Sequence, residues 1–261
     1  MATVHMESTS NTVSQQHWPI VHISMQPNQQ LEFYGTDVKE RIDPTWQGNS
    51  ISYKFNSSGL RMNKELKDID RNYIVAFGCS HTVGVGLPLE DTWIHLVSKE
   101  LDIDYINSAV VGSSVKLNAV NFFNMLNTVD VLPKAVIFAW PSSTRYCFFH
   151  NQQFVFYLPN YIPNDTEYSK FSESYRSLLM TDFNITESAM YRNMIRTTCS
   201  RLGIQYLDFG FDQDDDFTIN EKVAIIKLAQ PEYARDGSHF GISHHQSAAD
   251  LIKNSLRLSL I

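Results

Sequence analysis

A serine, a histidine and an aspartate are the residues of this chain whose types and spacing favour chemistry. Ser80 lies in residues 78–86, of sequence Gly-Cys-Ser-His-Thr-Val-Gly-Val-Gly, and follows the apolar run at 73–77. A hydroxyl at the carboxyl end of a buried strand lies where open α/β sheets bind ligands. Far downstream, Asp236 precedes His239 by three residues, so its carboxylate can orient the imidazole. Together they supply a nucleophile, a base and an orienting acid.

The same residues resemble a known family. The pattern Gly-x-Ser-x-Thr-x-Gly at 78–84 and the late Asp-x-x-His are similar to the SGNH (GDSL-type) esterases and lipases, over about residues 72–259. The resemblance implies a three-layer α/β/α sandwich with a parallel sheet, SGNH-hydrolase-like and flavodoxin-like. It also implies a Ser80-His239-Asp236 triad, and a Gly112 amide that helps to form the oxyanion hole.

Two positions depart from the family pattern. The family often has Asp before the serine, where this chain has Cys79. The family's third block carries an Asn that donates to the oxyanion, but the strand-like run at 135–140 is followed by Pro-Ser-Ser-Thr-Arg. The candidates to replace this oxyanion or substrate contact are Ser142, Ser143 and Arg145. Gly112 also fits a plain turn glycine, and Arg145 a solvated charge or an ion-pair partner.

Other motifs are disfavoured by their spacing. The serine segment is not a Gly-x-Ser-x-Gly elbow, and no Gly-Lys-Ser/Thr follows its glycines as in a P-loop. His244 and His245 come soon after His239, but adjacent histidines on a helix point in different directions. Since no Cys or carboxylate completes a ligand set, we expect no metal, and we expect no cofactor.

Composition limits the partners. The chain has 261 residues, 43% of them hydrophobic, with a net charge of -7, so nothing in its charge favours nucleic acid or an anionic membrane. The three cysteines lack paired spacing, and we find neither a signal peptide nor a run that would span a bilayer. We expect a cytoplasmic location, with a virion as the alternative, and no membrane insertion.

The elements that must position the chemistry follow a strand–helix rhythm. Residues 1–30 are expected to form a polar arm, either flexible or ordered by an assembly partner. Residues 31–70 are expected to form a small β-rich appendage, and residues 71–261 the α/β domain. Residues 141–182 are expected to be irregular and aromatic, either a functional insertion or a packed cover. Ser243 and Gln246 fit a capping box at the start of the last helix. The expected strands are 72–77, 103–109, 135–140 and 205–209; the expected helices are 90–101, 114–128, 184–202 and one from about 243.

Two classes of function follow. The first is a serine esterase-type hydrolase that acts on an ester through an acyl-enzyme, with O-acetyl groups of carbohydrate among the substrates the resemblance implies. The second is a catalytically weak or inactive SGNH-like module of a larger assembly such as a virion. The absent Asn and the polar arm permit this alternative.

Overall fold

Four short segments of the sequence, two of them wholly apolar, form the strands at the centre of the molecule. They are β4 (Tyr73–Phe77), β5 (Asp104–Asn107), β6 (Ala135–Trp140) and β9 (Gln205–Gly210). The computed structural model describes residues 4–5, 28–32, 51–150, 153–157, 183–211, 224–226 and 232–257. With β10 (Ala224–Ile225), the strands form one sheet in the order β10-β9-β6-β4-β5, and every neighbouring pair is parallel.

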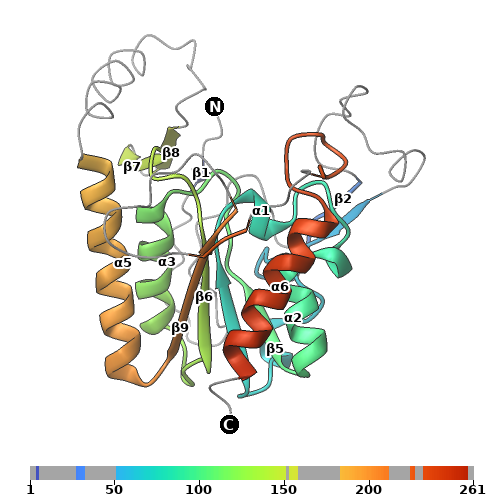
Figure 1. The fold of residues 1–261 in the computed structure, drawn as a ribbon, viewed down its shortest axis with the longest axis horizontal. Helices are drawn as coiled ribbons and strands as arrows, with labels where there is room; N and C mark the ends of the chain where they lie inside the picture. Colours follow the sequence, from blue (N-terminus) through green and yellow to red (C-terminus); the bar gives the residue numbers. More distant parts are fainter. Residues whose placement is uncertain are drawn as a thin grey trace.

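Helices cover both faces of this sheet (Figure 1). On one face lie α3 (Val115–Leu126) and α5 (Phe183–Leu202), and on the other lie α2 (Trp93–Leu101) and α6 (Ile242–Arg257). The three-layer α/β/α fold expected from the sequence is thereby confirmed. Because all strands are parallel, their carboxyl ends share one edge of the sheet, where α1 (Ser80–Val83) follows β4.

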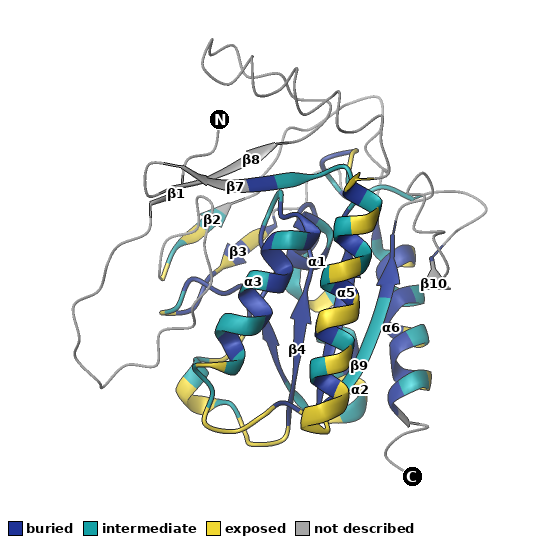
Figure 2. Ribbon diagram, turned by 90° about the vertical axis from the view of Figure 1, so that its left-hand side faces the viewer, coloured by how far each residue is buried: buried dark blue, intermediate teal, exposed yellow. Residues whose placement is uncertain are grey.

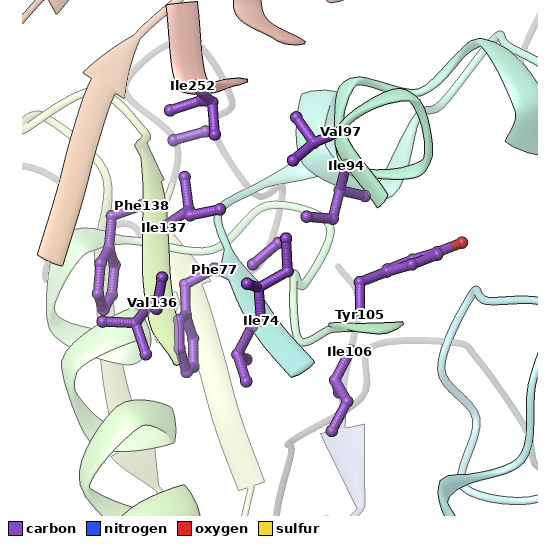
Figure 3. Packing of buried hydrophobic residues seen from close by; sticks show 14 of the residues in the cluster. Ile74, Phe77, Ile94, Val97, Tyr105, Ile106, Val136, Ile137, Phe138 and Ile252 are labelled. Carbon is purple, nitrogen blue, oxygen red and sulfur yellow. The ribbon is translucent and has the colours of Figure 1, made fainter. Parts of the chain in front are cut away.

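The core fills the space between sheet and helices. All residues of β4 and β6 are buried, as expected for central strands that are covered on both faces. Phe77 stacks on Phe138 with ring centroids 4.7 Å apart, while Ile137 points the other way, toward Ile252 of α6 (Figure 3). Each such side chain contributes about 1.5–3 kcal/mol by leaving water. Helix α5 exposes its outer face (Figure 2).

Outside the main sheet, the described residues form short antiparallel pairings. β2 (Gln30–Glu32) pairs with β3 (Ser52–Lys54) in the region expected to be β-rich. β7 (Tyr146–His150) and β8 (Gln153–Tyr157) form a hairpin, and β1 (Val4–His5) pairs with β8. The described residues also form the 3₁₀ helices η2 (Leu66–Asp68) and η3 (Leu89–Asp91).

Two expectations about local structure were wrong. The hairpin lies within the segment expected to be irregular, because its aromatic residues favour strands. Helix α6 begins at Ile242, so Ser243 lies inside it rather than at its cap. The backbone N–H of Ser243 instead donates to Glu232 Oε2 at 2.9 Å. Most of the expected polar arm, and residues 158–182 of the expected aromatic cover, lie outside the described residues.

Candidate active site

Ser80 lies at the point where the central strand of the sheet gives way to a helix. β4 ends at Phe77, and Ser80 is the first residue of α1. The helix is one turn long and ends at Gly84, whose left-handed conformation lets the chain turn away. Ser80 is 5% exposed, so little of this residue is open to solvent at the carboxyl edge of the sheet.

The structure brings Ser80, His239 and Asp236 together across 159 residues of sequence. His239 Nε2 lies 2.8 Å from Ser80 Oγ. The other ring nitrogen of His239, Nδ1, makes a short hydrogen bond to Asp236 Oδ2. With the proton on Nδ1 directed at the carboxylate, Nε2 is left as the acceptor for the serine hydroxyl.

Asp236 is fixed by its own turn. Its Oδ1 accepts the backbone N–H groups of Ser238 at 3.2 Å and His239 at 3.0 Å. Burial acts to raise the pKa of Asp236, but the hydrogen bond and charge of His239 and the two backbone donors outweigh it and lower the pKa to about 2. The carboxylate is therefore ionised at neutral pH and can stabilise an imidazolium beside it.

Ser238 is a further residue of this turn that the sequence analysis did not single out. Its hydroxyl donates to Asp236 Oδ2 at 2.9 Å, the same oxygen that faces the His239 ring. The signal available in the sequence was a hydroxyl residue between the acid and the histidine. Its position within the Asp-x-x-His turn allows it to bond the carboxylate locally.

His81 also belongs to the site's surroundings, although the resemblance assigns it no role. Its ring centroid lies 4.9 Å from that of His239 and 5.0 Å from that of Phe240. Burial, followed by the nearby His239, His245 and Arg145, holds the pKa of His81 well below its usual value. A neutral His81 therefore packs against the His239 ring and adds no charge beside it.

Gly112 lies in the loop that follows β5, next to β4 in the sheet. The loop is attached to the segment before Ser80, because Val110 N and Ser113 Oγ both donate to Gly78 O, at 3.2 and 2.7 Å. Gly112 itself has a positive φ of 75°. The loop that carries Gly112 is thus bonded to Gly78, which precedes Ser80 by two residues in the sequence.

Ser142, Ser143 and Arg145 lie in the loop that follows β6, on the other side of β4. The Ser142 and Thr144 hydroxyls are 2.6 Å apart, and Arg145 N donates to Ser142 O at 3.1 Å. Ser142 and Arg145 thus form a compact turn with Thr144. β4 lies between β5 and β6, so the Gly112 loop and this turn follow the two strands on either side of the one that leads to Ser80.

The described residues contain no group of three or more His, Cys, Asp and Glu side chains placed to hold a metal ion. His245 has a structural contact instead: its Nδ1 accepts the backbone N–H of Trp93 at 3.1 Å. Within the same part of the chain, no helix is sufficiently long and apolar to cross a bilayer. The contacts among Ser80, His239 and Asp236 suit nucleophilic and acid–base chemistry.

Comparison with known proteins gives similar folds only among solved structures. No protein-family model and no curated protein matches the chain. An esterase from Pseudoalteromonas sp. is 13% identical, with 72% of this chain and 98% of that one covered and a TM-score of 0.43. An acetyl xylan esterase from Butyrivibrio proteoclasticus is 15% identical, with 76% and 66% covered and a TM-score of 0.43.

A lipolytic protein of the G-D-S-L family from Veillonella parvula is 14% identical, with 68% of this chain and 94% of that one covered and a TM-score of 0.33. This third structure is described as a member of the G-D-S-L family, which is the family that the sequence motifs resemble. The likeness is low in identity and in TM-score, so the chemistry of this chain has to be inferred from its own residues.

Proposed function

We propose that this protein is a serine esterase-type hydrolase. Ser80 is the nucleophile, His239 the general base and Asp236 the residue that orients and stabilises the imidazole. The observation that carries the proposal is the 2.8 Å contact between Ser80 Oγ and His239 Nε2, with Asp236 on the opposite ring nitrogen. A serine hydroxyl is a weak nucleophile unless an adjacent base removes its proton, and this geometry supplies that base.

The reaction follows from these positions. Ser80 Oγ attacks the ester carbonyl carbon while His239 Nε2 takes the hydroxyl proton. The tetrahedral intermediate then collapses, the C–O bond to the alcohol breaks, and His239 returns the proton to the leaving oxygen. Water, deprotonated by His239, attacks the acyl-Ser80 ester. The second intermediate collapses as the bond between the acyl carbon and Ser80 Oγ breaks and His239 returns the proton to Oγ, which releases the acid and restores the serine. Asp236 stays ionised throughout and stabilises the imidazolium.

The oxyanion needs donors aimed at it before the reaction begins. We assign two of them to the backbone N–H groups of Ser80 and Gly112, because the Gly112 loop is attached beside the serine turn through Gly78. The family's Asn is missing here, and the loss of one such donor costs about 3 kcal/mol in transition-state stabilisation.

Arg145 is the best substitute for that Asn. The Ser142 hydroxyl is already bonded to Thr144, whereas the Arg145 guanidinium has neither a hydrogen bond nor an ion pair within the described residues. Its positive charge acts on His81, the residue after the nucleophile. A cation at this place suits a developing oxyanion or an anionic group on the substrate.

We take small acyl esters as the substrate class, and O-acetyl groups on carbohydrate as the first natural substrate to examine. The alternative is a non-catalytic module of an assembly. The absence of an Asn after β6 favours this second function, because a weak oxyanion hole would leave turnover low.

The test is active-site labelling combined with hydrolysis. A fluorophosphonate probe should label wild-type protein at Ser80 and leave Ser80→Ala and His239→Ala unlabelled. With p-nitrophenyl acetate, each single variant should lose about 10⁶-fold in kcat, and the double variant should be little worse, because the two residues act as one proton-transfer unit. Equal background rates for wild type and Ser80→Ala, across a panel that includes acetylated polysaccharide, would support the assembly module instead.

A further inference from the structure

Arg61 is a buried cation that lies against the loop following the nucleophile helix. Only 3% of it is exposed. Its guanidinium donates to the carbonyl oxygens of Val83 at 2.8 Å, Gly84 at 2.5 Å and Leu87 at 2.6 Å. Burial lowers the pKa of Arg61 to about 10, so it is charged at neutral pH, and the three carbonyl dipoles stabilise that charge.

A second buried residue supports the guanidinium and reaches the same loop. The guanidinium carbon of Arg61 lies 4.1 Å from the centroid of the Tyr53 ring, a distance typical of cation–π contact. The Tyr53 hydroxyl accepts the backbone N–H of Gly86 at 2.7 Å. Tyr53 and Arg61 therefore form hydrogen bonds with four of the five residues in the loop at 83–87.

The turn that delivers Arg61 is itself fixed. The Asn56 side-chain oxygen accepts the backbone N–H groups of Ser58 and Leu60, both at 3.0 Å. Its side-chain nitrogen donates to Lys64 O at 3.1 Å. Arg61 thus enters the core from a rigid turn next to β3, outside the α/β sheet that carries the candidate active site.

The loop at 83–87 also touches the acid side of the site. Gly86 O accepts the backbone N–H of Arg235 at 3.1 Å. A side-chain Cβ at Gly86 would lie 2.7 Å from Ala234 Cβ and 3.2 Å from Asp236 Oδ1. One end of the loop therefore continues from Ser80 in α1, and its middle packs directly on the segment that holds Asp236.

We infer that Tyr53 and Arg61 are positioning residues, which set the distance between Ser80 and the Asp236–His239 pair through the loop at 83–87. This inference rests on the proposed function. The serine and the acid come from distant parts of the sequence, and the loop is a structural link between them. Misplacement of reacting groups by about 1 Å can cost roughly 100-fold in rate, so a small shift of this loop should lower the rate even in a protein that stays folded.

The experiment separates positioning from stability. Tyr53→Phe removes only the hydroxyl, Arg61→Lys keeps the charge but not the forked geometry, and Arg61→Met removes both. The control is Ile74, a fully buried residue of β4 at the end away from Ser80. Ile74→Val and Ile74→Ala should lower stability by about 0.5–1.5 and 2–5 kcal/mol. Each variant is assayed well below its own melting temperature for kcat, KM and the rate of Ser80 labelling.

We expect kcat and the labelling rate to fall while KM changes little. Tyr53→Phe should lose about 10-fold, the equivalent of one hydrogen bond, and Arg61→Met about 100-fold, with Arg61→Lys in between. The Ile74 variants should keep wild-type rates at equal or larger losses of melting temperature. If the Tyr53 and Arg61 variants instead keep wild-type rates, or lose activity only as the Ile74 variants do, the inference is wrong. If Arg61→Met fails to fold, the kcat and the labelling rate of Tyr53→Phe decide whether the inference holds.

A readout without substrate keeps the inference separate from the proposed function. The proton between His239 and Asp236 should give a downfield proton NMR signal, which Asp236→Asn should abolish. If wild type hydrolyses no ester, the proposed function fails, but a signal that shifts or broadens in Tyr53→Phe and not in Ile74→Val would still support positioning. A signal unchanged in Tyr53→Phe and Arg61→Lys would overturn it.

Discussion

The two carboxylate oxygens of Asp236 make different contacts within one turn. Oδ1 accepts backbone N–H groups, which fixes the turn, and Oδ2 faces His239 and the Ser238 hydroxyl. With a pKa of about 2, the carboxylate does not titrate over the pH range in which an esterase would work. Any acid limb of activity above about pH 4 must therefore come from another group.

Replacing Asp236 by Asn should reduce turnover by about 10⁴-fold while the protein stays folded. The amide keeps the shape of the side chain, but it removes the negative charge that stabilises the imidazolium and the acceptor that sets the His239 tautomer. The loss should be smaller than that of Ser80→Ala, because nucleophile and base both remain. Steady-state hydrolysis of p-nitrophenyl acetate measures it.

Ser238→Ala is the matched control, because it removes a donor to the same carboxylate oxygen and leaves the charge. It should lose about 10-fold or less, the equivalent of one hydrogen bond. If Asp236→Asn proved as active as Ser238→Ala, Asp236 would have no role in orienting the base.

At the scale of elements, the candidate site lies at the edge of the sheet where three neighbouring parallel strands end. These strands are β4, β5 and β6, and the sheet order places the strand that leads to Ser80 between the other two. The fourth contribution, the turn with Asp236 and His239, comes from just before α6. The loop at 83–87 is the element that touches this turn from the serine side.

Gly86→Ala should damage activity through this contact. Gly86 has a φ of 82°, and an added Cβ would meet Ala234 and Asp236, so the acid turn must shift. We expect a loss of stability of about 1–3 kcal/mol from backbone strain, and a loss of kcat of roughly 100-fold from misplacement of the acid. Thermal unfolding and ester hydrolysis measure the two effects.

Gly203→Ala separates these two causes. Gly203 has a similar φ of 71° at the end of α5, but no atom lies within 4 Å of the added Cβ. It should show the loss of stability without the loss of turnover. Similar kcat values for both variants would mean that the contact between Gly86 and the acid turn has no catalytic consequence.

The elements that apolar runs define could be predicted from the sequence, and those that depend on distant contacts could not. The strand at 135–140 agrees with β6, whose buried positions are all hydrophobic. The hairpin of β7 and β8 was missed, because short aromatic-rich pieces have no period long enough to separate strand from loop.

The same division holds within the candidate site. Ser80, Asp236 and His239 carry a recognisable spacing, so their meeting could be predicted. Arg61 bonds carbonyl groups 22 to 26 residues away. Backbone carbonyls leave no mark in the residue types, so nothing in the sequence alone identifies them as its partners.

At the scale of the whole molecule, buried histidines connect the site to the layer formed by α2 and α6. His245 accepts the first backbone N–H of α2, and Phe211 lies between it and His81, with ring centroids 5.4 and 5.5 Å away. Burial lowers the pKa of His245 to about 3, with smaller effects of His244, Arg61 and His239 in the same direction. The folded protein therefore keeps this group of rings uncharged.

These histidines should make the whole fold sensitive to mild acid. In the unfolded chain His245 takes up a proton near pH 6.5, whereas in the folded protein it does so only near pH 3. Between these values the unfolded state binds more protons, so the free energy of unfolding must fall as pH is lowered. His245 alone should lower the free energy of unfolding by about 2–3 kcal/mol between pH 6.5 and 4.5, and His81 acts in the same direction.

Urea unfolding at pH 7.5, 6.5, 5.5 and 4.5 measures the slope of the free energy of unfolding against pH. In His245→Asn the amide oxygen can still accept the Trp93 N–H but cannot titrate, so this variant should show a clearly smaller slope. An equal slope in both proteins, or no loss of stability down to pH 4.5, would mean that His245 does not link folding to pH.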